Sequence, residues 1–211
     1  MEPARDAADP TGLEPNDLVF TPAVRAQQAR LGSRESYARF EAKRGFARDL
    51  SEDLARFVAE RDSFLLATAS ADGQPYVQHR GGPKGFLRVV GPRTLAFADY
   101  RGNRQYISIG NLSENPRAFL FLIDYANAAR VKLWGTAEFV EDDAELLASL
   151  TDPAYGEVPE RAIRFHVEAW DENCHKHIPR LVPAETHETG LLRARVAELE
   201  REVAALRAAA G

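Results

Sequence analysis

Clusters of polar and basic residues mark three places in the sequence that suit an anionic ligand. The first is QHRGGPKG, which runs from Gln78 to Gly85. Its adjacent glycines let a ligand or a second backbone approach closely, and His79, Arg80 and Lys84 supply hydrogen-bond donors and positive charge. A solvated hairpin loop has the same composition, so this segment alone does not establish a site.

The second cluster is RGNRQ, which lies where a strand is expected to end and a short helix to begin. Unpaired backbone N–H groups at the start of a helix attract phosphate, and Arg101 and Arg104 add positive charge. This cluster therefore predicts a phosphate site, with an exposed basic turn as the alternative.

In the third cluster, Arg130, Lys132 and Trp134 alternate along one expected strand, so their side chains share one face. Two cations and an indole on one face suit a flat, anionic, aromatic ligand. A polar outer face of the sheet is the alternative.

Motifs of other nucleotide-binding and hydrolytic enzymes are absent from the sequence. It contains no G-x-G-x-x-G after a strand, no G-x-x-x-x-G-K-[ST] loop and no G-x-S-x-G elbow. Cys174 and His175 are adjacent, a spacing that rarely chelates one tetrahedral ion, so we expect a structural thiol and no metal site.

The composition is that of a folded globular protein. Of 211 residues, 45% are apolar and 28% are charged, which is typical of one domain with a sizeable core. A net charge of -5 and a pI near 5.6 argue against nucleic acid as a partner. No apolar run approaches the roughly 18 to 20 residues of a membrane span, so we predict that the protein binds no membrane. The single cysteine fits a reducing compartment, so we predict a cytoplasmic protein.

Four segments are expected along the chain. Residues 1–20 lack periodicity and carry Pro, Gly and Asp, which predicts a disordered arm. Residues 21–62 are predicted to form helices, with Pro22 in a first turn and Ser51 as an N-cap. Residues 63–180 form a β-rich domain, and residues 181–211 form a linker and a C-terminal helix.

The β-rich domain is expected to contain seven strands, six of them in three hairpins. Turn residues such as Asp72-Gly73 join the paired runs, because Gly accepts the positive φ angles of a tight connection. Only short helices interrupt the strands, near residues 105–112 and 142–150. This order predicts a mainly β fold, a small antiparallel barrel with flanking helices, and excludes a doubly wound parallel sheet.

The C-terminal helix carries a heptad seam. Its apolar residues are spaced four, three, four and three apart, at Leu192, Val196, Leu199, Val203 and Leu206. Val at heptad position a and Leu at heptad position d favour a parallel two-stranded coiled coil. In that coil Arg195 would face Glu200 of a second copy, and Glu202 would face Arg207 of the second copy. The alternative is an amphipathic helix packed on its own domain.

Four linked blocks between about residues 63 and 179 resemble one known family. The blocks are GQPYVQHRGGPKGFLRVV, FADYRGNRQYISIGNLSENPRAFLFLIDY, RVKLWGTAEFVEDD and VEAWDENCHKHIP. They resemble the pyridoxamine 5'-phosphate oxidase-like family of FMN-binding split barrels, most closely a bacterial branch of undefined substrate. The resemblance implies a six-stranded antiparallel split barrel, a homodimer, and an FMN in each of two clefts between the subunits.

The resemblance also implies which residues contact FMN. The strand from Val77 to Arg80 would run beside the isoalloxazine ring, while Arg104, with Arg80, would bind the phosphate. Trp170 and Asn173 would come from the other subunit. The full set of implied cofactor-binding residues is Val77, Gln78, His79, Arg80, Gly81, Asn103, Arg104, Gln105, Arg130, Lys132, Trp134, Trp170 and Asn173. His79 is the candidate proton relay, because imidazole exchanges protons near neutral pH, with a hydrogen bond to backbone as the alternative.

One departure from the family pattern bears on the substrate. True pyridoxamine phosphate oxidases close the barrel with an Arg-x-His segment that grips the substrate phosphate, whereas this chain has WDENCH from Trp170 to His175. We therefore expect an FMN-dependent oxidoreductase that passes hydride or electrons to another small acceptor or to oxygen. The alternatives are a non-catalytic FMN storage or sensor protein and a deazaflavin-dependent reductase on the same fold.

Overall fold

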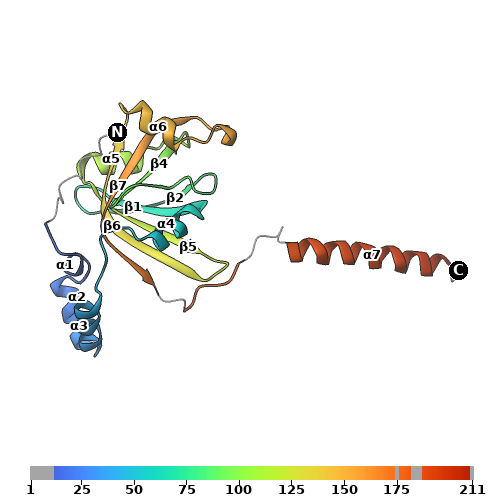
Figure 1. Cartoon of the computed structure of the whole chain (residues 1–211), viewed down its shortest axis with the longest axis horizontal. Coiled ribbons are helices and arrows are strands. Elements are labelled where there is room, and N and C mark those ends of the chain that lie inside the picture. The colour runs from blue at the N-terminus through green and yellow to red at the C-terminus, as the bar shows by residue number, and fades with distance from the viewer. Residues whose placement is uncertain (1–11, 174–175, 182–186, 210–211) are drawn as a thin grey trace.

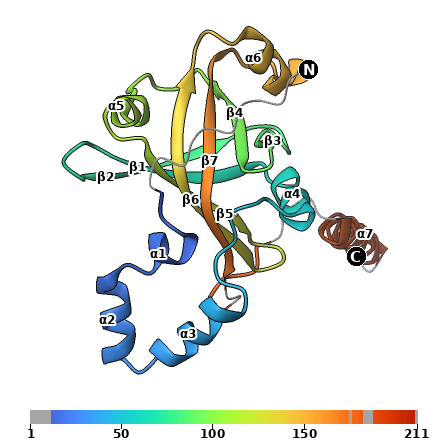
Figure 2. The same ribbon diagram turned by 60° about the vertical axis from the view of Figure 1, so that its left-hand side comes forward.

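Seven antiparallel strands form one sheet in the order β2-β1-β5-β6-β7-β4-β3 (Figures 1 and 2). The computed structural model describes residues 12–173, 176–181 and 187–209. The strands are β1 (Ser63–Ala69), β2 (Pro75–Gly81), β3 (Arg88–Gly91), β4 (Thr94–Tyr100), β5 (Arg117–Asp124), β6 (Ala129–Val140) and β7 (Pro159–Asn173). The helices are α1 (Pro15–Val19), α2 (Pro22–Arg30), α3 (Arg34–Lys43), α4 (Glu52–Ala59), α5 (Ile107–Glu114), α6 (Ala144–Leu150) and α7 (His187–Ala209), with a 3-10 turn at Pro153–Tyr155.

The three expected hairpins are confirmed, because β1 pairs with β2, β3 with β4, and β5 with β6. In the first hairpin Gly73 adopts a φ of 91° and its N–H donates to the Ser70 carbonyl at 3.0 Å. Only a residue without a Cβ takes this conformation at no steric cost, which is why Asp-Gly marks the turn.

The sheet curls until strands that are not neighbours in it share one core. Phe64 of β1 and Phe97 of β4 are separated in the sheet order by β5, β6 and β7, yet their ring centroids are 5.1 Å apart. Alternate residues of the strands point into the same buried cluster, as Leu66, Leu120 and Leu133 do. The fold is therefore a mainly antiparallel split barrel with flanking helices, as expected.

The strand count is seven, whereas the resemblance implied six. The shortest strand of the sheet is β3, which has four residues and pairs only with β4 at the sheet edge. The preceding Phe86 and Leu87 are buried, and this anchors the short segment that leads into β3.

The N-terminal segment differs from the expected disordered arm, because residues 12–20 are ordered and contain α1. Phe20 is buried and its ring contacts the rings of Tyr37 and Phe46, with centroids 5.2 and 5.0 Å away. Asn16 Oδ1 also accepts a hydrogen bond from the Phe46 backbone at 3.0 Å. These aromatic contacts stabilise residues 12–20 despite the Pro and Asp content that suggested disorder. Residues 1–11 lie outside the described part of the chain.

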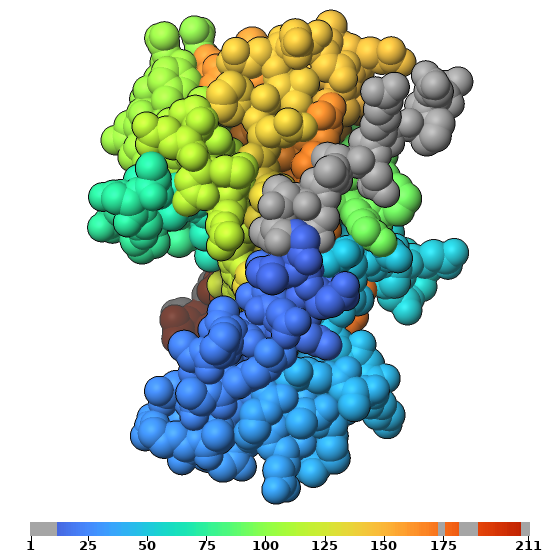
Figure 3. Space-filling model, turned by 90° about the vertical axis from the view of Figure 1, so that its left-hand side faces the viewer, coloured from blue at the N-terminus to red at the C-terminus, as the bar shows by residue number. Residues whose placement is uncertain are grey.

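Helices α1 to α3 form a lobe beside the sheet, coloured blue in Figure 3. The expected helix at residue 22 begins where the Thr21 hydroxyl accepts a bond from the Val24 N–H, at 3.3 Å. The expected helix after Ser51 is α4, and the Ser51 hydroxyl caps it by accepting from the Leu54 N–H at 3.1 Å. Leu54 is fully buried in the main core, so α4 closes one side of the barrel.

The C-terminal helix α7 projects away from the sheet (Figure 1). The side chains of residues 190–207 are all exposed, so the barrel does not cover them. Among the described residues, no helix combines the length and apolar character that crossing a membrane requires.

Candidate functional site

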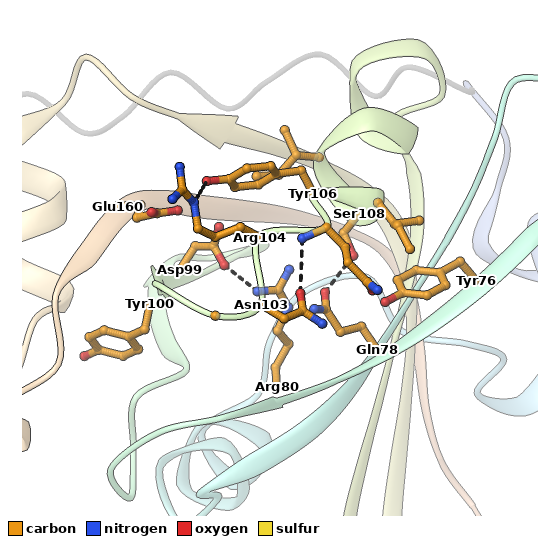
Figure 4. Close-up of a pocket in the computed structure, with 14 residues that line it drawn as sticks. Tyr76, Gln78, Arg80, Asp99, Tyr100, Asn103, Arg104, Tyr106, Ser108 and Glu160 are labelled. Atoms are coloured by element: carbon orange, nitrogen blue, oxygen red, sulfur yellow. Dashed lines mark hydrogen bonds and ion pairs between the residues drawn. The ribbon is translucent and has the colours of Figure 1, made fainter.

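A pocket lies where β2 and β4 approach each other without pairing (Figure 4). It encloses about 220 Å³. Its walls come from β2, β4, the loop that follows β4, the first turn of α5 and the start of β7. The lining residues are Tyr76, Gln78, Arg80, Asp99, Tyr100, Gly102, Asn103, Arg104, Gln105, Tyr106, Ile107, Ser108, Ile109 and Glu160.

The alternation of β2 decides which of its side chains enter the pocket. Gln78 and Arg80 line the pocket and are partly buried, whereas Val77 and His79 are exposed. Gln78 is fixed by a hydrogen bond that Ser108 Oγ donates to its Oε1 at 2.8 Å, which links β2 to α5. The pocket therefore receives every second residue of the predicted segment.

Arg80 is held in the pocket wall by an ion pair with Asp99 (Figure 4). Both side chains are mostly buried, and Asp99 Oδ2 also lies 3.8 Å from Arg161 Nη1. Arg80 Nε is buried and has no hydrogen-bond partner among the described residues. A buried donor without an acceptor is costly, so an incoming anion that accepts from this guanidinium edge would be favoured.

The loop after β4 contains two residues in a conformation that side chains disfavour. Arg104 and Tyr106 have φ angles of 61° and 54°, in the left-handed region. Each such residue costs about 1 kcal/mol or more, and such strain is concentrated at binding sites. Left-handed residues next to right-handed ones can turn backbone N–H groups toward one concave side, an arrangement that attracts anions.

Side chains also stabilise this loop. Arg104 Nε donates to the Tyr106 hydroxyl at 3.2 Å, and this bond, with the nearby charge of Glu160, raises the pKa of Arg104 above its ordinary value. Asn103 Oδ1 accepts from the Gln105 N–H at 3.2 Å. The guanidinium is thus kept charged at the pocket rim, and the loop backbone is held in place.

The first turn of α5 completes the basic side of the pocket. Residues 107–109 line it, and the first N–H groups of a helix lack partners within the helix. The acidic residues of the lining already have cationic partners: Asp99 pairs with Arg80, and Glu160 Oε1 lies 3.2 Å from Arg101 Nε. The donors that remain suit a phosphate or another compact anion.

The predicted residues of β6 lie outside this pocket, on the outer face of the sheet. Lys132 faces Asp171 across the β6–β7 pair, and Arg44 of the α3 terminus reaches Asp171 with a 2.9 Å ion pair. Burial lowers the pKa of Lys132 and raises that of Asp171, while each of their charges opposes the other's shift. Arg130 Nε is buried without a hydrogen-bond partner among the described residues.

Both predicted tryptophans make structural contacts in the single chain. The ring of Trp134 packs edge-on against Phe46 and Phe119, with centroids 5.7 and 5.1 Å away. Trp170 Nε1 donates to the Asp49 carbonyl at 2.9 Å. Their rings therefore join the N-terminal lobe and the segment before α4 to the sheet.

The remaining predicted residues have separate places. His79 is exposed on the outer face, and its cross-strand neighbour is Leu65. Gly81 ends β2 and pairs with Ser63. The backbone of Asn173 ends β7, but its side chain lies outside the described residues, as do Cys174 and His175. Lys84 forms an ion pair with Glu60 rather than lining the pocket.

One chain thus brings together Gln78, Arg80, Asn103, Arg104 and Gln105. It leaves Val77, His79, Lys132 and Trp134 on the outer face, whereas Trp170 packs against the core inside the barrel. Sequence reasoning missed several lining residues, namely Tyr76, Asp99, Tyr106, Ser108 and Glu160. Asp99 carried a usable signal, because a carboxylate within the apolar run TLAFAD needs a buried cation beside it.

Several solved structures are similar to part of this chain. Among solved structures, HupZ from Group A Streptococcus is 18% identical and covers 63% of this chain and 98% of its own, with a TM-score of 0.48. An FMN-binding protein from Syntrophomonas wolfei is 14% identical, with coverages of 71% and 97% and a TM-score of 0.43. HutZ, the heme storage protein of Vibrio cholerae, is 19% identical, with coverages of 58% and 94% and a TM-score of 0.41.

No curated protein matches the chain in a sequence search. A family model described as pyridoxamine 5'-phosphate oxidase matches residues 50–189, a stretch that contains all seven strands and the whole pocket. Because this match spans more than half of the sequence, the chain belongs to the pyridoxamine 5'-phosphate oxidase family.

Proposed function

We propose that the protein binds FMN, with the FMN phosphate in the pocket between β2 and β4, and acts as an FMN-dependent oxidoreductase on a small molecule. The observation that carries this proposal is the basic side of the pocket. Arg80 presents a buried Nε that has no hydrogen-bond partner within the described part of the chain. Arg104 lies on a strained loop beside the first turn of α5. These donors fit a phosphate group.

The chain's own residues bind and orient the cofactor. Arg80 and Arg104 supply charge-assisted hydrogen bonds to phosphate oxygens, and the loop N–H groups complete the cradle. FMN, when bound, supplies the hydride and electron transfer itself, so the protein needs no catalytic triad or acid pair. The half-buried Lys132, whose pKa burial lowers, is a donor that would tune a flavin placed near the outer face.

A second copy is needed to complete the proposed site. The pocket volume of about 220 Å³ is below the roughly 300 to 1,000 Å³ of clefts that bury a whole ligand of this size class. The other predicted contacts, such as Lys132 and His79, lie on the outer face of the same chain. We therefore propose a homodimer in which residues of one outer face meet the ligand held by the partner's pocket.

The outer face has the apolar character that such an interface requires. Val77 is 57% exposed and Leu65 is 37% exposed, and they lie beside the partly buried Phe119 and Phe121 in adjacent positions of β2, β1 and β5. A contiguous exposed apolar patch of this kind on a sheet is typical of a protein interface. Burying it would hold the two barrels together.

A storage or sensor protein that binds FMN without turnover is the second candidate. It is favoured by the lining of the pocket, where Asp99 and Glu160 are both engaged in ion pairs. The described lining contains no His, Lys or Cys, and the acidic hydroxyls among its residues are the phenols of Tyr76, Tyr100 and Tyr106. A deazaflavin-dependent reductase that uses the same site is the third candidate. For each of the three candidate functions we propose a cytoplasmic location, which the single cysteine of the chain supports.

The visible spectrum of the freshly purified protein tests cofactor identity. FMN gives two bands in the visible region and is released with its own mass on denaturation, whereas a colourless protein that does not bind added FMN would overturn the proposal. Steady-state reduction with NADH or NADPH then separates an oxidoreductase from a storage protein. We expect no oxidation of pyridoxamine phosphate, because WDENCH replaces the Arg-x-His segment.

A further inference from the structure

The C-terminal helix α7 carries an apolar seam that the barrel leaves uncovered. The seam consists of Leu192, Val196, Leu199, Val203 and Leu206, whose exposed fractions are 62%, 54%, 42%, 44% and 71%. No other side chain among residues 190–207 is buried either, so this stretch of the helix makes no core contact with the barrel. A helix of this length gains little stability from its backbone alone, and in proteins packing of an apolar face supplies most of it.

We propose that the α7 helices of two copies of this chain form a parallel, in-register, two-stranded coiled coil. The seam residues alternate Leu at d with Val at a, and this combination favours two parallel strands. Each helix supplies the cover that the other lacks.

The charges beside the seam fit this arrangement. At the flanking positions, Arg195 would face the partner's Glu200, and Glu202 would face the partner's Arg207. Within one chain Arg195 Nη1 lies 2.6 Å from Glu198, but both side chains are more than half exposed. An exposed pair of this kind contributes little, so Arg195 is available to a partner helix.

An antiparallel pair fits the seam less well. Charges alone do not exclude it, because Arg195 could then face the partner's Glu202. Its apolar layers, however, would pair Leu192 with the partner's Val203 and Val196 with the partner's Leu199. This leaves Leu206, the most exposed seam residue, without a layer. The parallel register pairs all five positions, each with its own counterpart, and therefore buries more apolar surface.

The coil would act as a tether between the two barrels. Linking two weakly associating modules raises overall avidity by about 10²- to 10⁴-fold without any new contact between them. This proposal deepens the homodimer proposed above but requires no flavin. The test of the coil can therefore fail while FMN binding is confirmed, and the coil can be confirmed while FMN binding fails.

Cysteine cross-linking in the full-length chain tests the orientation. In a Cys174→Ser background, which removes the only native thiol, Leu206→Cys places two thiols side by side in the parallel coil. In the antiparallel coil the same thiols lie about 25 Å apart, from a rise of 1.5 Å per residue. The matched control is Ala194→Cys, on the opposite side of the helix from the seam.

Mild oxidation is expected to convert most of the Leu206→Cys protein to a disulfide-linked dimer and to leave the Ala194→Cys protein largely monomeric on non-reducing gels. Equal cross-linking of the two variants, or none in either, would overturn the parallel coil. As a second measurement, Leu199→Lys should raise the dimer dissociation constant by about 10²-fold or more, and Ala194→Lys should not. An unchanged constant for Leu199→Lys would overturn the tether.

Discussion

Arg80 and Asp99 form an ion pair between β2 and β4, two strands that are not neighbours in the sheet. Their side chains are only 13% and 8% exposed. The pair therefore spans the split of the barrel and forms the floor of the pocket at the same time. In the proposed binding mode, barrel stability and anion binding would be coupled through this pair, because the guanidinium that meets the ligand is also the one that holds the two strands together.

Replacing Asp99 by Asn should lower the free energy of unfolding by about 3 to 5 kcal/mol, because the buried guanidinium of Arg80 then lacks its counter-charge. A phosphate would replace part of that charge, so FMN should stabilise Asp99→Asn more than it stabilises the wild type. Urea unfolding with and without FMN measures both effects. The control Glu138→Gln removes the carboxylate of the more exposed pair with Arg164 and should cost less than about 1 kcal/mol. Equal stability of the two variants would show that the Arg80–Asp99 pair does not close the split.

Much of the fold could be predicted from the sequence because its signals are local. The Asp-Gly turn, the alternation of Phe64 and Leu66, and the Ser51 cap each act within a few residues, and the structure contains all three features. The order of residues 12–20 could not be predicted in this way. It depends on Phe20 meeting Tyr37 and Phe46, which is a tertiary contact that overrides a local composition.

The candidate site was predictable only in part, for a related reason. The basic clusters at Arg80 and Arg104 were found from residue type and spacing, and the fold brings them into one pocket. Periodicity also places Val77 and His79 on the face opposite Arg80, so one chain cannot present all of them to one ligand. Whether a second chain reunites them is a question about assembly, and the sequence of a single chain carries little information on it.

Two substitutions of Arg104 separate its charge from its backbone conformation. Arg104→Ala and Arg104→Gly both remove the guanidinium, so each should weaken FMN binding by about 1.5 to 3 kcal/mol, measured by fluorescence titration. They should differ in stability, because only Gly adopts a φ of 61° without strain, and Arg104→Gly should be the more stable by about 1 kcal/mol. Arg56→Ala, on the exposed face of α4, is the control and should leave FMN affinity unchanged. Unaltered affinity in both Arg104 variants would remove Arg104 from the phosphate site.

The carboxyl of Asp124 should make stability depend on pH in the acid range. Burial on its own raises the pKa of Asp124, but hydrogen bonds from Asn127 and the 2.9 Å ion pair with Arg61 outweigh it, so the pKa lies below its ordinary value. A lowered pKa in the folded state contributes stability above the unfolded pKa of about 3.9, and this contribution is lost as the pH falls through the folded value. Asp124→Asn should therefore be less stable than the wild type at pH 7, and the difference should shrink on acidification below about pH 4.

Unfolding curves from neutral to acid pH measure this difference in stability. The control is Asp142→Asn, at an exposed position, and its difference from the wild type should be small throughout. A difference for Asp124→Asn that stayed constant with pH would show that the ion pair does not govern this titration.

The outer-face dimer can be tested at Val77, which is 57% exposed and so contributes little to the core of its own barrel. Val77→Asp should leave the fold intact and yet weaken dimerisation, because the interface would then enclose two carboxylates without partners. The measurement is sedimentation over a range of concentrations in a Leu199→Lys background, so that the C-terminal helices do not hold the copies together. Since the proposed flavin site needs both subunits, FMN affinity should fall in parallel with the fraction of dimer.

Val158→Asp is the matched control, because Val158 is 64% exposed and lies outside the apolar patch of β2, β1 and β5. If both variants dimerise as well as the parent, the two barrels meet through another surface, and Lys132 and His79 are not brought to the partner's pocket.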